Sequence, residues 1–347
     1  MGFTCAIICL VGWGCADLFY KMSSDEGDNH SHLKIAVWVG IVMGVCAFIL
    51  LPFSETSFTP GGIVINSIKY FPASLCYILS MVIGYAGLRY LEVSIISPVQ
   101  NSSGGLAAAA MIIWFAASGR FANIKEEYGF IDIFGTLLCV LGVVLLAVVE
   151  KRLDNMKDPE LDGKFKLPDV GSKIFLAESQ MTADTRKAPV NNLKKNGAKA
   201  LIFPILYCVF DTIGTAADGI ILDEETGLGL GEIDVIVLYG LTFFIMGIIA
   251  WLYMLLKEKR PYNPFELKEV RTKGAAALFE EFGQVFYVFA MAENPVLTAP
   301  IVASYCIVSV ILSRAFLGER LKRPQYVCVF IVICGIVIMG ISEGLGA

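Results

Sequence analysis

The sequence has few charged residues and only two histidines. Asp, Glu, Lys and Arg make up 17% of the 347 residues, against about 25% in an average soluble domain. Hydrophobic residues make up 56%, and the mean hydropathy is +0.69. A water-soluble globule has no place for apolar residues in long blocks. The composition therefore excludes a cytosolic enzyme, a nucleic-acid binder and a disordered chain.

Motifs for catalysis, metal binding and disulfide bonding are also missing. The sequence contains no HExxH, GxSxG or ATP-binding motif. None of the ten cysteines forms a CxxC pair or lies at ligand spacing from a histidine. We therefore expect no catalytic residue, no metal and no cofactor. The net charge of −5 gives no reason to expect nucleic acid as a partner.

Apolar runs long enough to cross a lipid bilayer, about 20 residues each, are the main feature of the sequence. A hydrophilic stretch, 150–198, separates two groups of five, so we predict three parts: 1–149, 150–198 and 199–347. The fold class is an all-α membrane protein with ten transmembrane helices. The predicted helices cover 3–20, 35–52, 70–90, 93–118, 130–149, 199–222, 233–256, 274–292, 295–316 and 325–342.

The two groups of five runs share a pattern that indicates a duplication. The matching positions are Asp17 and Asp218, Tyr85 and Tyr287, Pro98 and Pro300, and Gly142 and Gly335. The two aspartates lie 81 and 82 residues before the prolines, and each tyrosine lies 13 residues before its proline. With five helices each, the halves would cross the membrane in opposite directions. Inverted repeats of this kind are typical of secondary transporters, whose substrate site lies near the membrane midplane.

The end of the ninth run and the start of the tenth resemble a known family. Leu317-Gly-Glu-Arg-Leu321, followed by Gln325 and by Gly335 ten residues later, is similar to ten-helix EamA-type transporters of the drug/metabolite transporter superfamily. The resemblance implies that helices one, three, four, six, eight and nine line a cavity while five and ten stay peripheral. Two segments are longer than in the family: the central linker and 119–134.

Ionisable and amide side chains gather in the helices that this resemblance assigns to the cavity. An ionisable residue costs about 2.5–3.5 kcal/mol in a membrane helix, so it usually faces protein or a water-filled cavity. We predict a substrate-binding site built around a helical stripe of Glu280, Gln284 and Tyr287, at i, i+4 and i+7. The other predicted members are Asp211, Asp218, Asp17, Gln100, Asn101, Tyr85 and Ser304.

Several of these residues have a second interpretation. The stripe on the eighth helix could be a structural hydrogen-bond cluster, and Asp17 and Asp218 could reach headgroup water near their helix ends. Glu281 points about 100° from Glu280 and could bond to a neighbouring helix. The segment after Pro98 is either an opened helix that binds a ligand or an ordinary kink with glycine packing.

Two further groups of residues carry open interpretations. Trp13, Tyr77, Tyr85 and Tyr207 are either cation–π walls or plain packing. A group of acidic and histidine side chains could chelate a metal, although a solvated loop is the favoured interpretation. That group consists of Asp25, Glu26, Asp28, His30 and His32.

The distribution of basic residues predicts an orientation. With ten helices, all but three of the 27 Lys and Arg residues fall on the side of the central linker, the exceptions being Lys69, Arg120 and Lys125. The positive-inside rule then places the linker in the cytoplasm and both termini outside a plasma (cytoplasmic) membrane. The family resemblance alone implies cytoplasmic termini, and we give the charges more weight.

These features predict a secondary transporter of a small cationic or zwitterionic solute, with export by alternating access and coupling to protons. Its partners are the small-molecule substrate and the lipid bilayer, and a homodimer is left open. An intramembrane enzyme and a non-transporting scaffold or sensor are the alternatives. The enzyme would form product in detergent, and the scaffold would tolerate loss of Glu280.

Overall fold

The computed structural model describes most of the chain outside the central linker. It describes residues 1–23, 28, 30–54, 59–87, 100–119, 129–155, 202–223, 227–258, 262–317 and 322–346. Several predicted features lie outside these residues, namely Asp25, Glu26, Pro98, 318–321 of the family motif and most of the linker.

The described residues form helices and no strand. Eight helical segments are long and apolar enough to cross a membrane, and α5 and the apolar part of α7 are shorter. The helices are α1 (Gly2–Ser23), α2 (Ser31–Leu50), α3 (Pro60–Gly87), α5 (Ser103–Ala117), α7 (Phe130–Asn155), α10 (Ile202–Ile221), α11 (Glu232–Glu258), α12 (Leu267–Glu269), α13 (Ala275–Glu293), α14 (Pro295–Ala303), α15 (Tyr305–Leu317) and α16 (Arg323–Gly346). A π-helical turn, Val270–Gly274, joins α12 to α13. The prediction of an all-α membrane protein is therefore confirmed, while the count of ten spans and the division into three parts stay predictions.

The third helix begins earlier than the sequence pattern predicts. We expected it to start at residue 70, but α3 begins at Pro60. Thr59 accepts a hydrogen bond from the backbone N–H of Gly62 (3.1 Å), and Pro60 takes the first helical position, where its missing N–H costs nothing. The helix continues through Pro72, so this second proline does not mark a boundary.

Helices of the two halves pack against each other in pairs. The most extensive contacts join α2 to α11, α7 to α16, α1 to α13, α10 to α3, and α14 to α5. If each helix is replaced by its counterpart in the other predicted half, the α1–α13 pair becomes the α10–α3 pair. The other three pairs stay the same. This pairing is what an inverted repeat requires, although the repeat itself stays a prediction.

Small residues let the paired helices approach closely. A methyl group on Gly40 of α2 would lie 2.6 Å from the carbonyl oxygen of Phe243 and 2.8 Å from the Cα atom of Gly247, both on α11. On α7, a methyl group on Gly142 would overlap Val332 of α16. Backbone contact of this kind replaces the hydrophobic driving force that lipid does not supply.

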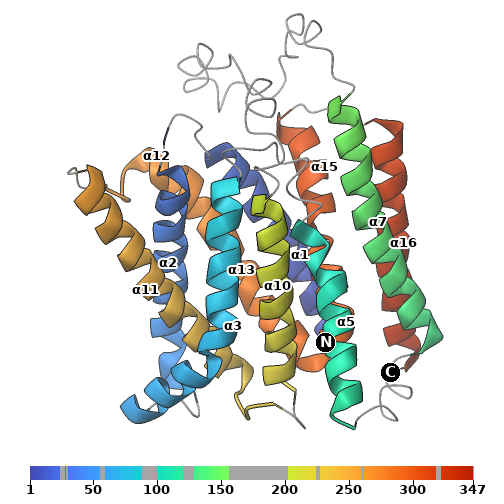
Figure 1. Cartoon of the computed structure of the whole chain (residues 1–347), viewed down its shortest axis with the longest axis horizontal. Coiled ribbons are helices and arrows are strands. Elements are labelled where there is room, and N and C mark those ends of the chain that lie inside the picture. Colours follow the sequence, from blue (N-terminus) through green and yellow to red (C-terminus); the bar gives the residue numbers. More distant parts are fainter. Residues whose placement is uncertain are drawn as a thin grey trace, which may run out of the picture.

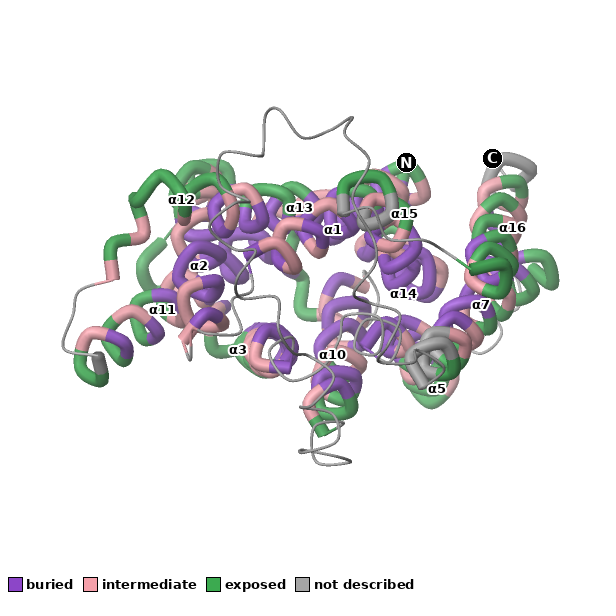
Figure 2. Tube along the Cα trace, turned by 90° about the horizontal axis from the view of Figure 1, so that it is seen from above, coloured by how far each residue is buried: buried purple, intermediate pink, exposed green. Residues whose placement is uncertain are grey.

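Two helix pairs lie at opposite ends of the molecule. Figures 1 and 2 show α7 and α16 together at one end, and α2 and α11 at the other. Between these ends lie α1, α3, α10, α13 and α14, which carry many buried residues, and α2 is as rich in buried residues as they are (Figure 2). Both chain termini lie at the same end of the helices (Figure 1). The functional site is therefore to be sought in the centre.

Candidate functional site

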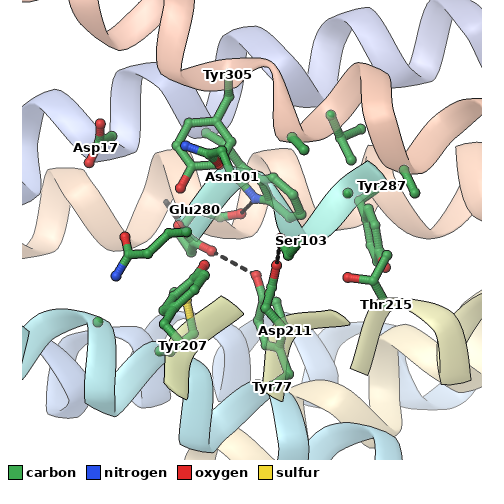
Figure 3. A pocket seen from close by; sticks show the side chains of 18 of the residues that line it. Asp17, Tyr77, Asn101, Ser103, Tyr207, Asp211, Thr215, Glu280, Tyr287 and Tyr305 are labelled. Atoms are coloured by element: carbon green, nitrogen blue, oxygen red, sulfur yellow. Dashed lines mark hydrogen bonds between the residues drawn. The ribbon is translucent and has the colours of Figure 1, made fainter. Parts of the chain in front are cut away.

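A buried cavity of about 70 Å³ lies in this centre. It has room for several water molecules. Side chains from α1, α3, α5, α10, α13, α14 and the start of α15 form its wall, together with residues 100 and 101 just before α5 (Figure 3). These are helices one, three, four, six, eight and nine of the predicted ten. The lining residues are Trp13, Asp17, Tyr20, Tyr77, Met81, Gly84, Tyr85, Gln100, Asn101, Ser103, Gly104, Tyr207, Asp211, Thr215, Glu280, Tyr287, Ala299, Val302, Ala303 and Tyr305.

Glu280 occupies the middle of this wall. Its side chain is 5% exposed, and its Oε1 atom accepts a hydrogen bond from the Tyr77 hydroxyl at 3.2 Å (Figure 3). The backbone carbonyl of Glu280 accepts a second bond from Trp13 Nε1 at 3.3 Å. The partners come from α3 and α1, so α13 is fixed in rotation with Glu280 turned into the cavity.

The predicted stripe on α13 does not face the cavity along its whole length. Glu280 and Tyr287 line it, but Gln284 does not, although its side chain is buried. Among the described residues, neither amide atom of Gln284 has a hydrogen-bond partner. Glu281 is buried against Cys46 of α2, in agreement with the interpretation that it bonds to a neighbouring helix.

Asp211 and Asp17 also reach the cavity, each held by a serine from another helix. Ser103 at the start of α5 donates to Asp211 Oδ2 at 2.5 Å. Ser309 on α15 donates to Asp17 Oδ2. Figure 3 shows Asp211 beside Tyr77 and Ser103, while Asp17 lies apart, on the opposite side from Tyr287. The cavity thus has two central carboxyl groups and one at its edge.

Asp218 lies outside the cavity. The alternative that this side chain reaches headgroup water is wrong, because it is 2% exposed and bonded inside the bundle. It accepts hydrogen bonds from Tyr70 of α3 at 2.7 Å and from Tyr287 of α13 at 3.1 Å. The sequence could not show this, because a helical face fixes which residues lie together but not which neighbour they meet.

The polar residues of the predicted fourth and ninth helices differ in their surroundings. Gln100 and Asn101 line the cavity, and Gln100 Nε2 has no hydrogen-bond partner in the part of the chain that the structure describes. Ser304 does not line it; this residue interrupts the helix between α14 and α15, and its hydroxyl donates to the carbonyl of Pro300 at 2.8 Å. A methyl group on Gly104 would lie 2.5 Å from the carbonyl oxygen of Ala299, so close glycine packing also occurs here.

Aromatic side chains form much of the cavity wall. Trp13, Tyr77, Tyr85 and Tyr207, which the sequence suggested as walls, all line it. The ring of Trp13 lies 5.1 Å from that of Tyr287 and 6.0 Å from that of Tyr305. Rings around carboxyl groups form an environment that attracts organic cations.

Sequence reasoning missed four polar members of the wall, Tyr20, Ser103, Thr215 and Tyr305. Helical spacing contained a signal for two of them. Tyr20 follows Asp17 by three residues, and Thr215 follows Asp211 by four, so each lies on the face of a predicted site residue. Tyr305 had no such signal, because it follows the break at Ser304.

The cavity is acidic. Its lining includes three carboxyl groups and, within the part of the chain that the structure describes, no Lys, Arg or His. The same part of the chain contains no cluster of three His, Cys, Asp or Glu side chains able to hold a metal ion. The arrangement favours a positively charged ligand over an anion.

A separate ion pair joins Asp28, in the loop that carries the acidic and histidine side chains, to Lys34 in the first turn of α2. Asp28 Oδ2 lies 2.7 Å from Lys34 Nζ, and its Oδ1 atom accepts a hydrogen bond from the backbone N–H of His30. Partial burial raises the pKa of Asp28, but the bonds and charge of Lys34 and the His30 amide outweigh it, so the pKa lies below its ordinary value. Lys34 also lies over the ring of Tyr262, 5.3 Å from its centre.

An all-helical membrane bundle with an acidic cavity at its centre defines the class as a multi-pass membrane protein with an internal cavity. Residues 226–341 match the model of the EamA-like transporter family, so the predicted resemblance is confirmed over this part of the chain. One solved structure, titled "Crystal structure of protein", is 12% identical, with a TM-score of 0.55 over 100% of this chain and 99% of that chain. This likeness concerns the fold alone. No curated protein matches.

Proposed function

We propose that the protein is a secondary transporter that moves a small cationic or zwitterionic solute across the plasma membrane by alternating access. The observation that carries this proposal is the buried cavity with three carboxyl groups and no basic lining residue among those described. Each ionisable side chain in the bilayer costs about 2.5–3.5 kcal/mol of insertion free energy. Helix packing alone does not need such side chains. The family match over 226–341 supports transport over catalysis or scaffolding.

In this proposal, different residues of the cavity bind different chemical groups of the same solute. Glu280 and Asp211 bind its cationic group, and the rings of Trp13 and Tyr287 cover it. The unpartnered Nε2 of Gln100 is a donor for a carboxylate or carbonyl of the solute.

The size of the cavity supports alternating access. At about 70 Å³ it holds water but is too small for a solute the size of an amino acid. Binding therefore requires the surrounding helices to move apart, and the crossing of helices from both predicted halves provides the surfaces for that motion. We propose export, driven by proton entry, with the central linker in the cytoplasm and both termini outside.

The test is solute-induced thermal stabilisation of the purified protein over a panel of amines, amino acids, sugars and carboxylates. A solute that binds the folded state raises the melting temperature by mass action. We expect amines or amino acids to stabilise the wild type and to lose this effect in Glu280→Gln. Glu281→Gln is the matched control, because Glu281 is the next residue and is buried outside the cavity.

Two results would contradict the proposal. Stabilisation by anionic carboxylates alone would refute the cationic or zwitterionic substrate. Equal stabilisation of wild type and Glu280→Gln by an amine would show that Glu280 is structural. Uptake of the stabilising solute into proteoliposomes, absent from protein-free liposomes, then separates transport from mere binding.

A further inference from the structure

Asp218 differs from the carboxyl groups of the cavity in its surroundings. It is 2% exposed and does not line the cavity. Among the described residues it accepts hydrogen bonds from two neutral hydroxyl groups, Tyr70 at 2.7 Å and Tyr287 at 3.1 Å. No Lys, Arg or His among the described residues pairs with it. A carboxylate buried in a bilayer without a cation is costly, and binding a proton removes that cost.

The two hydroxyl groups suit a carboxyl group that changes its protonation state. A tyrosine hydroxyl donates to a carboxylate, and it also accepts a bond from a protonated carboxyl group. The site therefore keeps hydrogen bonds in both states, which a site with fixed N–H donors would not. The other titratable groups that face Asp218 are Cys76 on α3, Tyr239 on α11 and Asp211 two turns earlier on α10.

Tyr287 connects this carboxyl group to the cavity. Its ring lines the cavity and lies 5.1 Å from the ring of Trp13, while its hydroxyl is bonded to Asp218. A change at Asp218 must therefore alter a side chain of the solute site directly.

A second set of contacts runs from Asp218 towards Glu280. Tyr70 donates to Asp218, Tyr77 donates to Glu280, and the ring of Tyr239 lies between them, 5.7 Å and 5.1 Å from theirs. The hydroxyl of Tyr239 is buried and has no hydrogen-bond partner among the described residues. A buried hydroxyl of this kind is able to bond to a water molecule.

We propose that Asp218, together with the hydroxyl groups of Tyr70 and Tyr287, is a proton-binding site separate from the solute cavity, and that Tyr287 couples the two. This inference rests on the proposed transport function. It assigns the solute to Glu280 and Asp211 and the coupling proton to Asp218. Tyr287 is then a positioning residue that transmits the protonation state.

The first test needs only protons as the probe. Infrared difference spectra of the purified protein between about pH 5.5 and pH 8.5 should contain the C=O band of a carboxyl group that loses its proton. We expect Asp218→Asn to remove one such band and Tyr70→Phe to shift it. Asp132→Asn is the control, because Asp132 is held by a backbone N–H of Gly129 at the start of α7. Spectra of Asp218→Asn equal to those of the wild type would overturn the proposal.

The second test uses the fluorescence of Trp13 to measure the coupling between Asp218 and the solute cavity. The sequence has four tryptophans, so replacing the other three by phenylalanine leaves Trp13 as the sole reporter in the cavity. Its fluorescence should change with pH, and we expect Asp218→Asn and Tyr287→Phe each to reduce that change at least twofold. An unaltered pH profile in Tyr287→Phe would refute the coupling.

These tests separate the two proposals. Neither uses a solute, so both can succeed while the solute panel fails, and the proposed substrate class alone is then lost. If the panel succeeds but the infrared band is absent, the transporter proposal stands without a proton site at Asp218.

Discussion

The close approach of α5 to α14 is predicted to depend on the absence of a side chain at Gly104. This residue lines the cavity, and its Cα faces the last turn of α14. In Gly104→Ala the added methyl group would overlap the Cβ atom of Ala303 and lie 2.5 Å from the carbonyl oxygen of Ala299. Ordinary contacts between carbon atoms are about 3.5–4.0 Å, so the two helices must separate by about 1 Å.

The expected loss in the free energy of unfolding follows from this displacement. Ala303 presents its short side chain and Ala299 its backbone, and neither can turn aside as the end of a long side chain does. Overpacking of a well-packed contact costs about 1–3 kcal/mol. We expect the midpoint of thermal unfolding in detergent to fall, and solute binding to weaken because α5 carries one wall of the cavity.

Gly61→Ala is the matched control. Gly61 is exposed in the first turn of α3, and a methyl group there would have no neighbour within 4 Å. We expect this variant to be as stable as the wild type or slightly more stable, since alanine is favoured over glycine in a helix by about 0.5–1 kcal/mol. The reasoning is refuted if Gly104→Ala unfolds at the wild-type midpoint.

Two further predictions concern helix ends and pH. Asn294 caps α14 by accepting the backbone N–H of Leu297 at 3.2 Å, so Asn294→Ala should cost about 0.5–2 kcal/mol; an unchanged unfolding midpoint would contradict this. Lys34→Met should lose up to about 1 kcal/mol near pH 7. Since the folded-state pKa of Asp28 is lowered, its ion pair contributes stability above the unfolded pKa, about 3.9, and loses it as pH falls through the folded pKa. The unfolding midpoints of Lys34→Met and the wild type should therefore converge below about pH 4, and a constant difference would count against the ion pair.

Much of the fold could be predicted from the sequence because lipid imposes a simple rule. A segment in hydrocarbon must be helical and apolar, so the runs of α1, α2, α11 and α16 were visible from composition. The start of α3 was not, because Thr59 acts through a local hydrogen bond at the helix end and Pro60 through its fixed φ, and neither acts through hydropathy.

The candidate site was predicted in part for a related reason. Glu280, Asp211 and Asp17 were found because charge in an apolar run is rare and costly. Their roles as solute ligands stay predictions. Tyr305 was missed, because an aromatic residue in a membrane helix gives the same pattern whether it faces lipid, protein or a cavity.

The sequence by itself determined the membrane environment, the helical class and the set of polar residues that must avoid lipid. Only the tertiary structure decided how that set is divided. Asp211 and Asp218 are seven residues apart and nearly on one face of α10, yet one opens into the cavity and the other is enclosed by Tyr70 and Tyr287. The physical reason is that helical periodicity fixes the direction of a side chain within its own helix. What that side chain meets depends on how other helices cross it, and helix crossing is set by packing between residues far apart in the chain.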